Sequence, residues 1–236
     1  CNSGAEANEN AMKLASFVTG KSKVIAMKGA FHGRTSLAVA ATDNPSIVAP
    51  VNQTDHVVFV PLNDEAALEA AFEGGDVSSV IIENIQGVGG VRMAGEGFVR
   101  KIRSLCDRYG ALYIADEVQC GIFRSGKPFA FQTYGVEPDI MSLAKGIADG
   151  VPMGAVMAKK EIADVFKPGD HGSTFGGSCL AIAACAATLS ALVRGDYADH
   201  AAKVGAYMEA KLAKLPNVTE VRGRGLMLGC DLDDAA

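Results

Sequence analysis

Residues 112–119 read Leu-Tyr-Ile-Ala-Asp-Glu-Val-Gln, a short apolar run that passes directly into acidic and amide side chains. A continuous apolar run of this length is typical of a strand in a parallel sheet, which has both faces covered. The interior of such a strand does not accommodate a carboxylate, so Asp116 marks the place where the chain leaves the sheet. The stretch therefore predicts a buried strand over 112–116 that carries polar side chains at its carboxyl end.

Two other stretches end in the same way. Residues 80–84 read Val-Ile-Ile-Glu-Asn, and residues 140–145 read Ile-Met-Ser-Leu-Ala-Lys. In an open α/β sheet the carboxyl ends of parallel strands share one edge, and ligands bind there. We therefore expect Glu83, Asp116 and Lys145 to converge at this edge.

Short apolar runs alternate with helical patterns along most of the chain. Ser3 and Glu6 have the spacing of a capping box, which predicts a helix from Ser3 to about residue 18. The other expected elements are strands at 24–27, 56–60, 79–83, 112–116, 140–143 and 155–158, and helices at 65–72, 98–109, 180–193 and 197–215. This rhythm predicts an α/β fold with a mostly parallel sheet flanked by helices. The loop after the strand at 24–27 should bring Phe31, His32 and Arg34 to the same edge.

The helical pattern breaks at Leu215-Pro216-Asn217, and two strand-like runs follow at 218–221 and 226–232. This predicts a large domain over 1–215 and the beginning of a smaller C-terminal domain over 216–236. The chain opens without a methionine, and motif residues begin at once. We therefore expect it to be a piece of a longer protein.

Composition narrows the possible partners. The 236 residues are 49% hydrophobic and 21% charged, with a net charge of −5. Interspersed charges without a basic face argue against nucleic acid as a partner. No apolar run has the length of a membrane span, and no secretory signal opens the chain. The six cysteines form no C-x-x-C pair and only four histidines are present, so we expect no metal site, free thiols and a cytoplasmic location.

An aspartate, a lysine and a glycine-containing helix start on one edge have a specific chemical use, although each alone has an ordinary structural explanation. Pyridoxal 5'-phosphate (PLP) carries a phosphate, a pyridine nitrogen and an aldehyde. A helix N-terminus binds phosphate, and a buried carboxylate keeps the pyridine nitrogen protonated. A lysine forms a Schiff base with the aldehyde. The set therefore fits PLP.

Six motifs of this chain resemble those of the class-III, PLP-dependent aminotransferase family and occur in the family's order. They are Cys1–Asn8 (CNSGAEAN), Gly29–Thr35 (GAFHGRT), Asp116–Gln119 (DEVQ), Ser142–Gly146 (SLAKG), His171–Gly177 (HGSTFGG) and Arg222–Met227 (RGRGLM). The resemblance covers nearly the whole chain. It implies the PLP-dependent transferase fold of type I.

The resemblance also implies roles for single residues. The cofactor-binding residues would be Ser3, Gly4 and Ala5 at the phosphate, Phe31 and Val118 on the two ring faces, Asp116 at the ring nitrogen, Gln119 at the ring hydroxyl and Lys145, also the catalytic residue, in the Schiff base. Thr174 would contact the phosphate bound to a neighbouring subunit, which implies a homodimer with a shared active site. Arg34 would bind a substrate carboxylate. Glu83 would support the site from behind, with a purely local structural role as the alternative.

The activity that the resemblance implies is ping-pong transamination between an amino-acid substrate and a 2-oxo acid. The motif at 31–35 and the compact spacing of the motifs resemble those of one branch of the family. The enzymes of that branch act on N-acetylornithine or N-succinylornithine, with 2-oxoglutarate as acceptor, in arginine biosynthesis. Enzymes acting on ornithine or 4-aminobutyrate, and aminomutases or a decarboxylating transaminase, remain alternatives within the family.

Residues 83–90 depart from the family pattern E-P-x-Q-G-E. Asn84 stands where proline is usual, and Val88 stands where a glutamate is usual. In related enzymes that glutamate neutralises an arginine when a free amine enters. Val88 cannot do this, which favours an acylated substrate.

Two further interpretations lie outside transamination. A non-catalytic binding or dimerising fragment is compatible with a partial chain, but it would have no use for Lys145 beside Asp116. A nicotinamide dehydrogenase would share the α/β rhythm. The chain has no G-x-G-x-x-G turn after its first predicted strand, which argues against this class.

Overall fold

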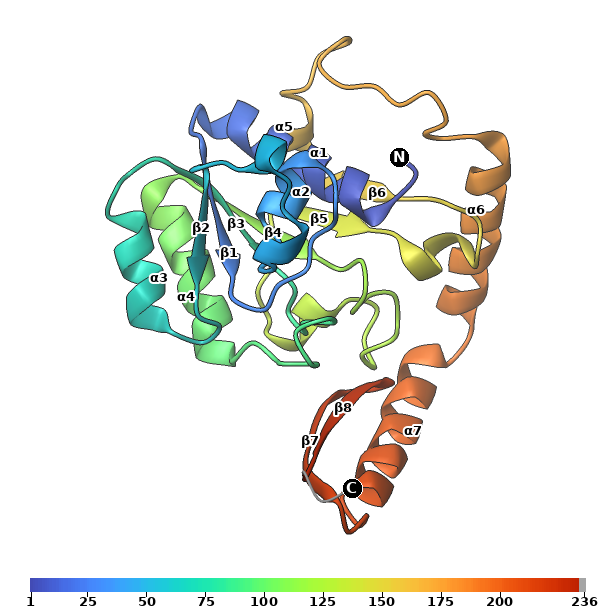
Figure 1. Cartoon of the computed structure of the whole chain (residues 1–236). Helices are drawn as coiled ribbons and strands as arrows, with labels where there is room; N and C mark the ends of the chain where they lie inside the picture. The colour runs from blue at the N-terminus through green and yellow to red at the C-terminus, as the bar shows by residue number, and fades with distance from the viewer. Residues whose placement is uncertain (234–236) are drawn as a thin grey trace.

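The computed structural model describes residues 1–233 and contains a six-stranded sheet in the order β2-β1-β3-β4-β5-β6 (Figure 1). The strands are β1 (Lys23–Met27), β2 (Val57–Val60), β3 (Val77–Ile82), β4 (Leu112–Asp116), β5 (Ile140–Leu143) and β6 (Ala155–Ala158). Strands β1 to β5 pair in parallel, and β6 pairs antiparallel to β5. The predicted mostly parallel sheet is confirmed.

Helices cover both faces of this sheet (Figure 1). They are α1 (Gly4–Thr19), α2 (Ser36–Ala40), α3 (Glu65–Phe72), α4 (Glu96–Tyr109), α5 (Lys160–Ala163), α6 (Cys179–Arg194) and α7 (Tyr197–Leu212), and single 3₁₀ turns are η1 (Pro45–Ile47), η2 (Pro50–Asn52), η3 (Ala130–Thr133) and η4 (Lys145–Ala148). All six residues of β3 are buried. A strand buried on both faces is mostly apolar along its whole length, as the sequence predicted.

The two faces of the sheet are separated by the alternation of side chains along each strand. On one face Val80 and Ile82 of β3 pack with α3 and α4 in one apolar cluster. On the other face Ile81 and Ile114 pack with α1, α2 and α5 in a second cluster. Because these helices anchor the strands from both sides, the carboxyl ends of β3, β4 and β5 are held in fixed relative positions.

The N-terminus of α1 lies beside these strand ends. The Oγ of Ser3 accepts a hydrogen bond from the Glu6 N–H at 3.2 Å, which is one half of the predicted capping box. The Glu6 carboxylate does not close the box on Ser3, because it accepts from the N–H of Asn2 at 2.7 Å. The helix ends at Gly20, whose φ of +67° is readily adopted by glycine.

A smaller lobe follows the sheet domain. Strands β7 (Val218–Arg224) and β8 (Met227–Leu232) form an antiparallel hairpin, and α7 packs against both. Figure 1 shows this lobe below the sheet domain, joined to it by α6. The predicted domain boundary after residue 215 stays a prediction. Because α7 packs against the hairpin, we describe this helix as part of the smaller lobe.

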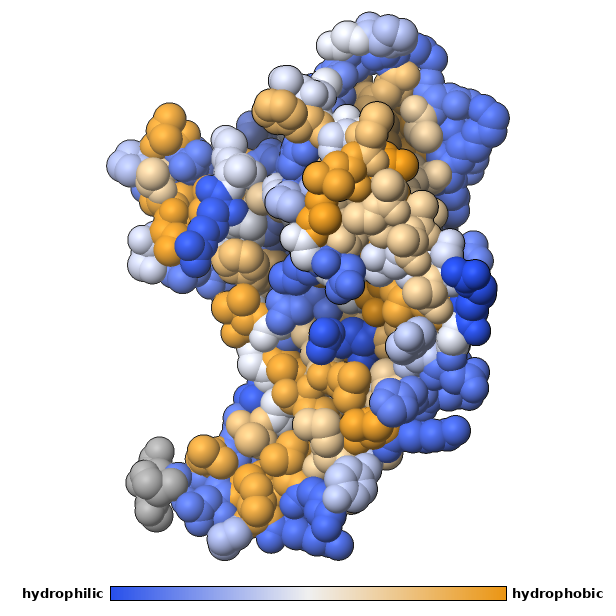
Figure 2. Space-filling model, turned by 90° about the vertical axis from the view of Figure 1, so that its right-hand side faces the viewer, coloured by the Kyte–Doolittle hydropathy of each residue, from blue (hydrophilic) through white to orange (hydrophobic). Residues whose placement is uncertain are grey.

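One side of the molecule, formed by α6 and α7, carries many exposed apolar side chains (Figure 2). Leu180 and Val193 of α6 are 73% and 74% exposed, and Tyr207 of α7 is 64% exposed. Within residues 1–233, no single helix is long and apolar enough to cross a bilayer, and α6 with α7 meets that test only as a pair bent by 70°.

Candidate active site

A cavity of about 430 Å³ opens at the carboxyl ends of β3, β4 and β5. Its lining includes Ser3, Gly4, Ala5, Phe31, Arg34, Glu83, Asp116, Val118, Gln119 and Lys145, which are ten of the eleven predicted site residues. The eleventh, Thr174, is exposed on the segment between α5 and α6 and does not line the cavity. The volume is in the range of cofactor and small-ligand pockets.

The first turn of α1 forms one wall of this cavity. The N–H groups of a first helical turn have no partner within the helix, and together with the helix dipole they favour an anion. Gly4 is required here because a Cβ on it would lie 2.7 Å from Cγ1 of Val118, which follows β4. The close approach of α1 to the end of β4 therefore depends on the absence of a side chain at Gly4.

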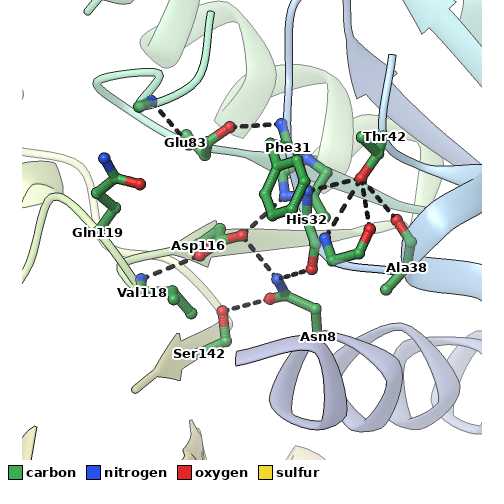
Figure 3. A network of polar contacts seen from close by, with 12 residues as sticks. Asn8, Phe31, His32, Ala38, Thr42, Glu83, Asp116, Val118, Gln119 and Ser142 are labelled. Atoms are coloured by element: carbon green, nitrogen blue, oxygen red, sulfur yellow. Dashed lines mark hydrogen bonds and ion pairs between the residues drawn. The ribbon is translucent and has the colours of Figure 1, made fainter. Parts of the chain in front are cut away.

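Asp116 lies in the floor of the cavity and is only 2% exposed. Figure 3 shows its carboxylate within a network of hydrogen bonds. Its Oδ2 accepts from Nδ2 of Asn8 at 2.7 Å and lies 2.8 Å from Nδ1 of His32. Its Oδ1 accepts from the N–H of Val118 at 3.0 Å. Since each carboxylate oxygen can accept two hydrogen bonds, Oδ1 retains one acceptor position, which a protonated ring nitrogen could fill.

His32 is the buried partner of Asp116. Burial by itself lowers the pKa of His32, but the hydrogen bond to Asp116 and the negative charges of Asp116 and Glu83 outweigh it. The pKa of His32 therefore lies above its ordinary value. Because a carboxylate only accepts, Nδ1 of His32 must carry the hydrogen in this contact.

Glu83 lines the cavity and joins two loops. Its Oε1 accepts from the N–H of Phe31 at 2.8 Å, and its Oε2 accepts from the N–H of Gly87 at 2.9 Å. Burial, together with the charge of Asp116, raises the pKa of Glu83 to about 6, although the charge of His32 and the two backbone donors lower it. The supporting role of Glu83 stays a prediction, and its contacts fix the backbone from which the Phe31 ring projects.

Glu117 lies directly behind the floor and points away from the cavity. Its carboxylate accepts from the N–H groups of Ala130 and Phe131, each at 2.9 Å. Glu117 as a whole is 1% exposed. Burial raises the pKa of Glu117 to about 7, against the lowering effect of these two donors. The side chain therefore anchors η3 rather than serving the site.

Lys145 and Arg34 lie at the open side of the cavity, and both are exposed. Lys145 follows β5 with a φ of +50°, and its Nζ donates to Oε1 of Gln119 at 2.9 Å. The guanidinium carbon of Arg34 lies 5.9 Å from the centre of the Phe31 ring. Both cations therefore face the cavity with few fixed contacts.

Asn8 and Ser142 belong to this network, but the sequence analysis did not predict them. Asn8 donates to Asp116, and its Oδ1 accepts from the Ser142 hydroxyl at 2.5 Å. One signal was available, because Asn8 lies four residues after Gly4 and therefore on the same face of α1. Ser142, the partner of Asn8 on β5, could not be predicted from this spacing.

The residues present fit PLP. A helix N-terminus can bind the phosphate, Asp116 has an acceptor position for the ring nitrogen, and Lys145 lines the same cavity. Among residues 1–233, no group of three or more histidine, cysteine, aspartate or glutamate side chains is placed to hold a metal ion.

Comparisons with known proteins agree on one family. The model of the class-III aminotransferases matches residues 1–236. The chain is 45% identical over 239 residues to an acetylornithine aminotransferase of Bacillus subtilis (strain 168), covering 99% of this chain and 62% of the relative. It is 46% identical over 239 residues to an acetylornithine aminotransferase of Methanopyrus kandleri, covering 99% and 60%. The chain thus spans about three fifths of the length of these curated relatives.

Solved structures agree with this result. An ornithine aminotransferase from Toxoplasma gondii, described with partial occupancy of PLP at its active site, superimposes with a TM-score of 0.93 at 34% identity. The match covers 99% of this chain and 58% of that one. An (S)-enantioselective omega-transaminase from Thermomicrobium roseum superimposes with a TM-score of 0.91 at 31% identity, covering 99% and 60%.

Proposed function

This chain belongs to the class-III aminotransferase family, and on that premise we propose that it forms the cofactor-binding part of a PLP-dependent enzyme that moves the amino group of an N-acylornithine to 2-oxoglutarate. The observation that carries the proposal is the convergence of Asp116, Lys145 and the first turn of α1 on one cavity. The curated relatives named acetylornithine aminotransferases favour N-acetylornithine as the donor.

PLP supplies an electron sink next to the substrate carbon that carries the amino group. The free N–H groups of Gly4 and Ala5 would bind its phosphate, and Asp116 would stabilise the charge of its ring nitrogen. Phe31 and Val118 line the cavity and would cover the two ring faces. Together these residues would hold the reacting centre in place and exclude water from the ring.

Lys145 carries the chemistry that the protein itself performs. Its Nζ would hold the cofactor covalently at the aldehyde. Once a substrate amine has taken its place, the same Nζ would serve as the group that takes up and returns the proton of the substrate carbon. The 2.9 Å contact with Gln119 shows that Nζ has a neutral partner available when it is not bonded to the cofactor.

Substrate selection involves Arg34 and Val88 in this proposal. Arg34 faces the cavity and can bind a substrate carboxylate through two parallel hydrogen bonds. Val88 is 69% exposed, one residue after Gly87, which donates to Glu83. An uncharged side chain at this position suits an acylated substrate end, because no free amine needs a carboxylate there.

The assembly and setting of the enzyme belong to the same proposal. Thr174 lies on an exposed segment outside the cavity, so it is free to contact the phosphate in a second subunit. A homodimer with shared active sites accords with this placement, and we propose a cytoplasmic location and a role in arginine biosynthesis as part of the same hypothesis. Sedimentation of the purified protein with and without PLP tests the dimer.

The proposal is tested by adding PLP, reducing with borohydride and mapping the labelled peptide. We expect the phosphopyridoxyl group on Lys145, and none at this position in Lys145→Ala. Lys160→Ala is the matched control, because Lys160 is an exposed lysine that pairs with Asp164. Label on several lysines, or none on a folded protein, would contradict the proposal.

Substrate identity requires a second measurement. The full-length protein is assayed with 2-oxoglutarate and, in turn, N-acetylornithine, N-succinylornithine, ornithine and 4-aminobutyrate. We expect kcat/KM to be highest for an acylated ornithine. A preference for ornithine or 4-aminobutyrate would contradict the substrate assignment and leave the cofactor assignment intact.

A further inference from the structure

Asn8, which lines the cavity, connects α1 to three other segments (Figure 3). Its Nδ2 donates to Oδ2 of Asp116 at 2.7 Å and to the backbone carbonyl of His32 at 2.8 Å. Its Oδ1 accepts from the hydroxyl of Ser142 at 2.5 Å. One amide thus links α1 to the end of β4, to the loop that carries Phe31, and to β5, which leads into Lys145.

The orientation of this amide is dictated by its partners. A carboxylate and a backbone carbonyl can only accept, so the NH₂ group of Asn8 must face Asp116 and His32. The oxygen then faces Ser142, whose hydroxyl is able to donate. Asn8 is 1% exposed, which leaves little access for solvent water to replace a missing hydrogen bond.

Asn8 also has a particular place relative to the cavity. It lies one helical turn beyond Gly4, on the same face of the helix whose first turn lines the cavity. Asp116 lies in the floor of that cavity. A bond between Asn8 and Asp116 therefore fixes the distance between the first turn of α1 and the carboxylate.

We propose that Asn8 is a positioning residue, whose amide holds the Asp116 carboxylate in register with the first turn of α1 so that both ends of one cofactor are bound at once. This inference rests on the proposed function, because the register matters only if a phosphate and a ring nitrogen are bound together. Asn8 also lines the cavity, and in this proposal it acts through the Asp116 carboxylate to which it donates.

The chain offers a matched control on the same helix. Asn10 is also buried, but it lines a different cavity with Leu14, Phe166 and His171. Within the described residues its Oδ1 has no hydrogen-bond partner. Replacing Asn10 removes a buried amide from α1 without touching the network around Asp116.

The experiment compares Asn8→Leu, which preserves approximate size and removes the polar atoms, with Asn10→Leu and the unaltered protein. The readouts are the dissociation constant of PLP, the pH dependence of the visible absorption of bound PLP, and thermal stability without PLP. We expect Asn8→Leu to bind PLP roughly tenfold to hundredfold more weakly, because the three hydrogen bonds of Asn8 are lost and one of them is to the charged Asp116 carboxylate.

We also expect the pH dependence of the absorption to shift in Asn8→Leu, because the carboxylate that faces the ring nitrogen loses a donor. Asn10→Leu should stay within about twofold of the unaltered protein in affinity and keep its pH profile. A general loss of helix stability would affect both variants, whereas a positioning role affects only Asn8→Leu. Equal affinity and equal pH profiles in both variants would overturn the inference.

A second variant keeps the test decisive if Asn8→Leu does not fold. Asn8→Ala removes the same amide donor to Asp116 with a side chain smaller than asparagine, so it fits the space without a clash and favours the helix. Weaker PLP binding with a shifted pH profile in Asn8→Ala supports the inference, and an affinity and a profile identical to those of the unaltered protein overturn it. Failure of the unaltered protein to bind PLP at Lys145 would instead overturn the proposed function, before any variant is compared.

Discussion

The floor and the open side of the cavity are built in opposite ways. The floor, defined as Asn8, His32, Glu83 and Asp116, is buried and its members are hydrogen-bonded to several different segments. The open side, defined as Arg34 and Lys145, is exposed, and within residues 1–233 its side chains make one hydrogen bond, from Lys145 to Gln119. The buried groups of the floor are thus immobilised, whereas the groups that we propose to meet the substrate keep their freedom.

This difference has an energetic consequence. A buried carboxylate is stable only when donors surround it, so changes in the floor should cost both folding stability and activity. An exposed lysine contributes little to stability, so changes at the open side should cost activity alone. The following substitutions test that separation, from the largest expected effect to the smallest.

Lys145→Ala gives the largest expected effect and tests the open side. Removing the nucleophile and proton carrier should lower kcat by about 10⁴-fold. The free energy of unfolding of the cofactor-free protein should change by less than about 1 kcal/mol, because Lys145 is exposed. Steady-state kinetics and denaturant unfolding measure the two quantities. A large loss of stability would break the comparison.

Asp116→Ala tests the floor. It leaves Asn8, His32 and the Val118 N–H without their shared acceptor. We expect a loss of about 3 kcal/mol in the free energy of unfolding, and a fall in activity of about 10²–10³-fold. Denaturant unfolding of the cofactor-free protein provides the first number. Wild-type stability with lost activity would mean that the floor serves only the cofactor.

Glu117→Gln tests the cost of burying charge behind the floor. Glu117 has its pKa raised from 4.5 to about 7 by burial, so between these pH values the folded protein binds a proton more tightly than the unfolded chain. Through this group the free energy of unfolding falls as pH rises from about 4.5 to about 7, by roughly 3 kcal/mol. In Glu117→Gln this fall should be reduced, as measured by denaturant unfolding at several pH values. An equally steep fall in both proteins would contradict this account.

Val88→Glu should have the smallest effect and extends the comparison to an exposed position on the segment that follows β3. A carboxylate there would attract the free amine of ornithine. We expect kcat/KM for ornithine relative to N-acetylornithine to rise about two- to fivefold, the range of an exposed ion pair. Stability should stay within about 0.5 kcal/mol. Competition assays with both substrates measure the ratio, and no change would mean that Val88 does not contact the substrate.

The sequence predicted the sheet, most element positions and the convergence of Glu83, Asp116 and Lys145. It placed strands 112–116, 140–143 and 155–158 within the bounds that the structure has. It did not predict the short helices α2 and α5, which have five and four residues and carry too little periodicity to be recognised. It also extended α7 to residue 215, three residues beyond its end at Leu212.

The sequence by itself determined which residues lie in strands and helices, because periods of 2 and 3.6 are local properties of the chain. It also determined which polar groups stand at the strand ends. Only the tertiary structure decided how those groups are held. The bonds from Asn8 to Asp116 and from Ser142 to Asn8 join residues 108 and 134 positions apart. Such contacts depend on the packing of α1 across the sheet, and no local pattern encodes that packing.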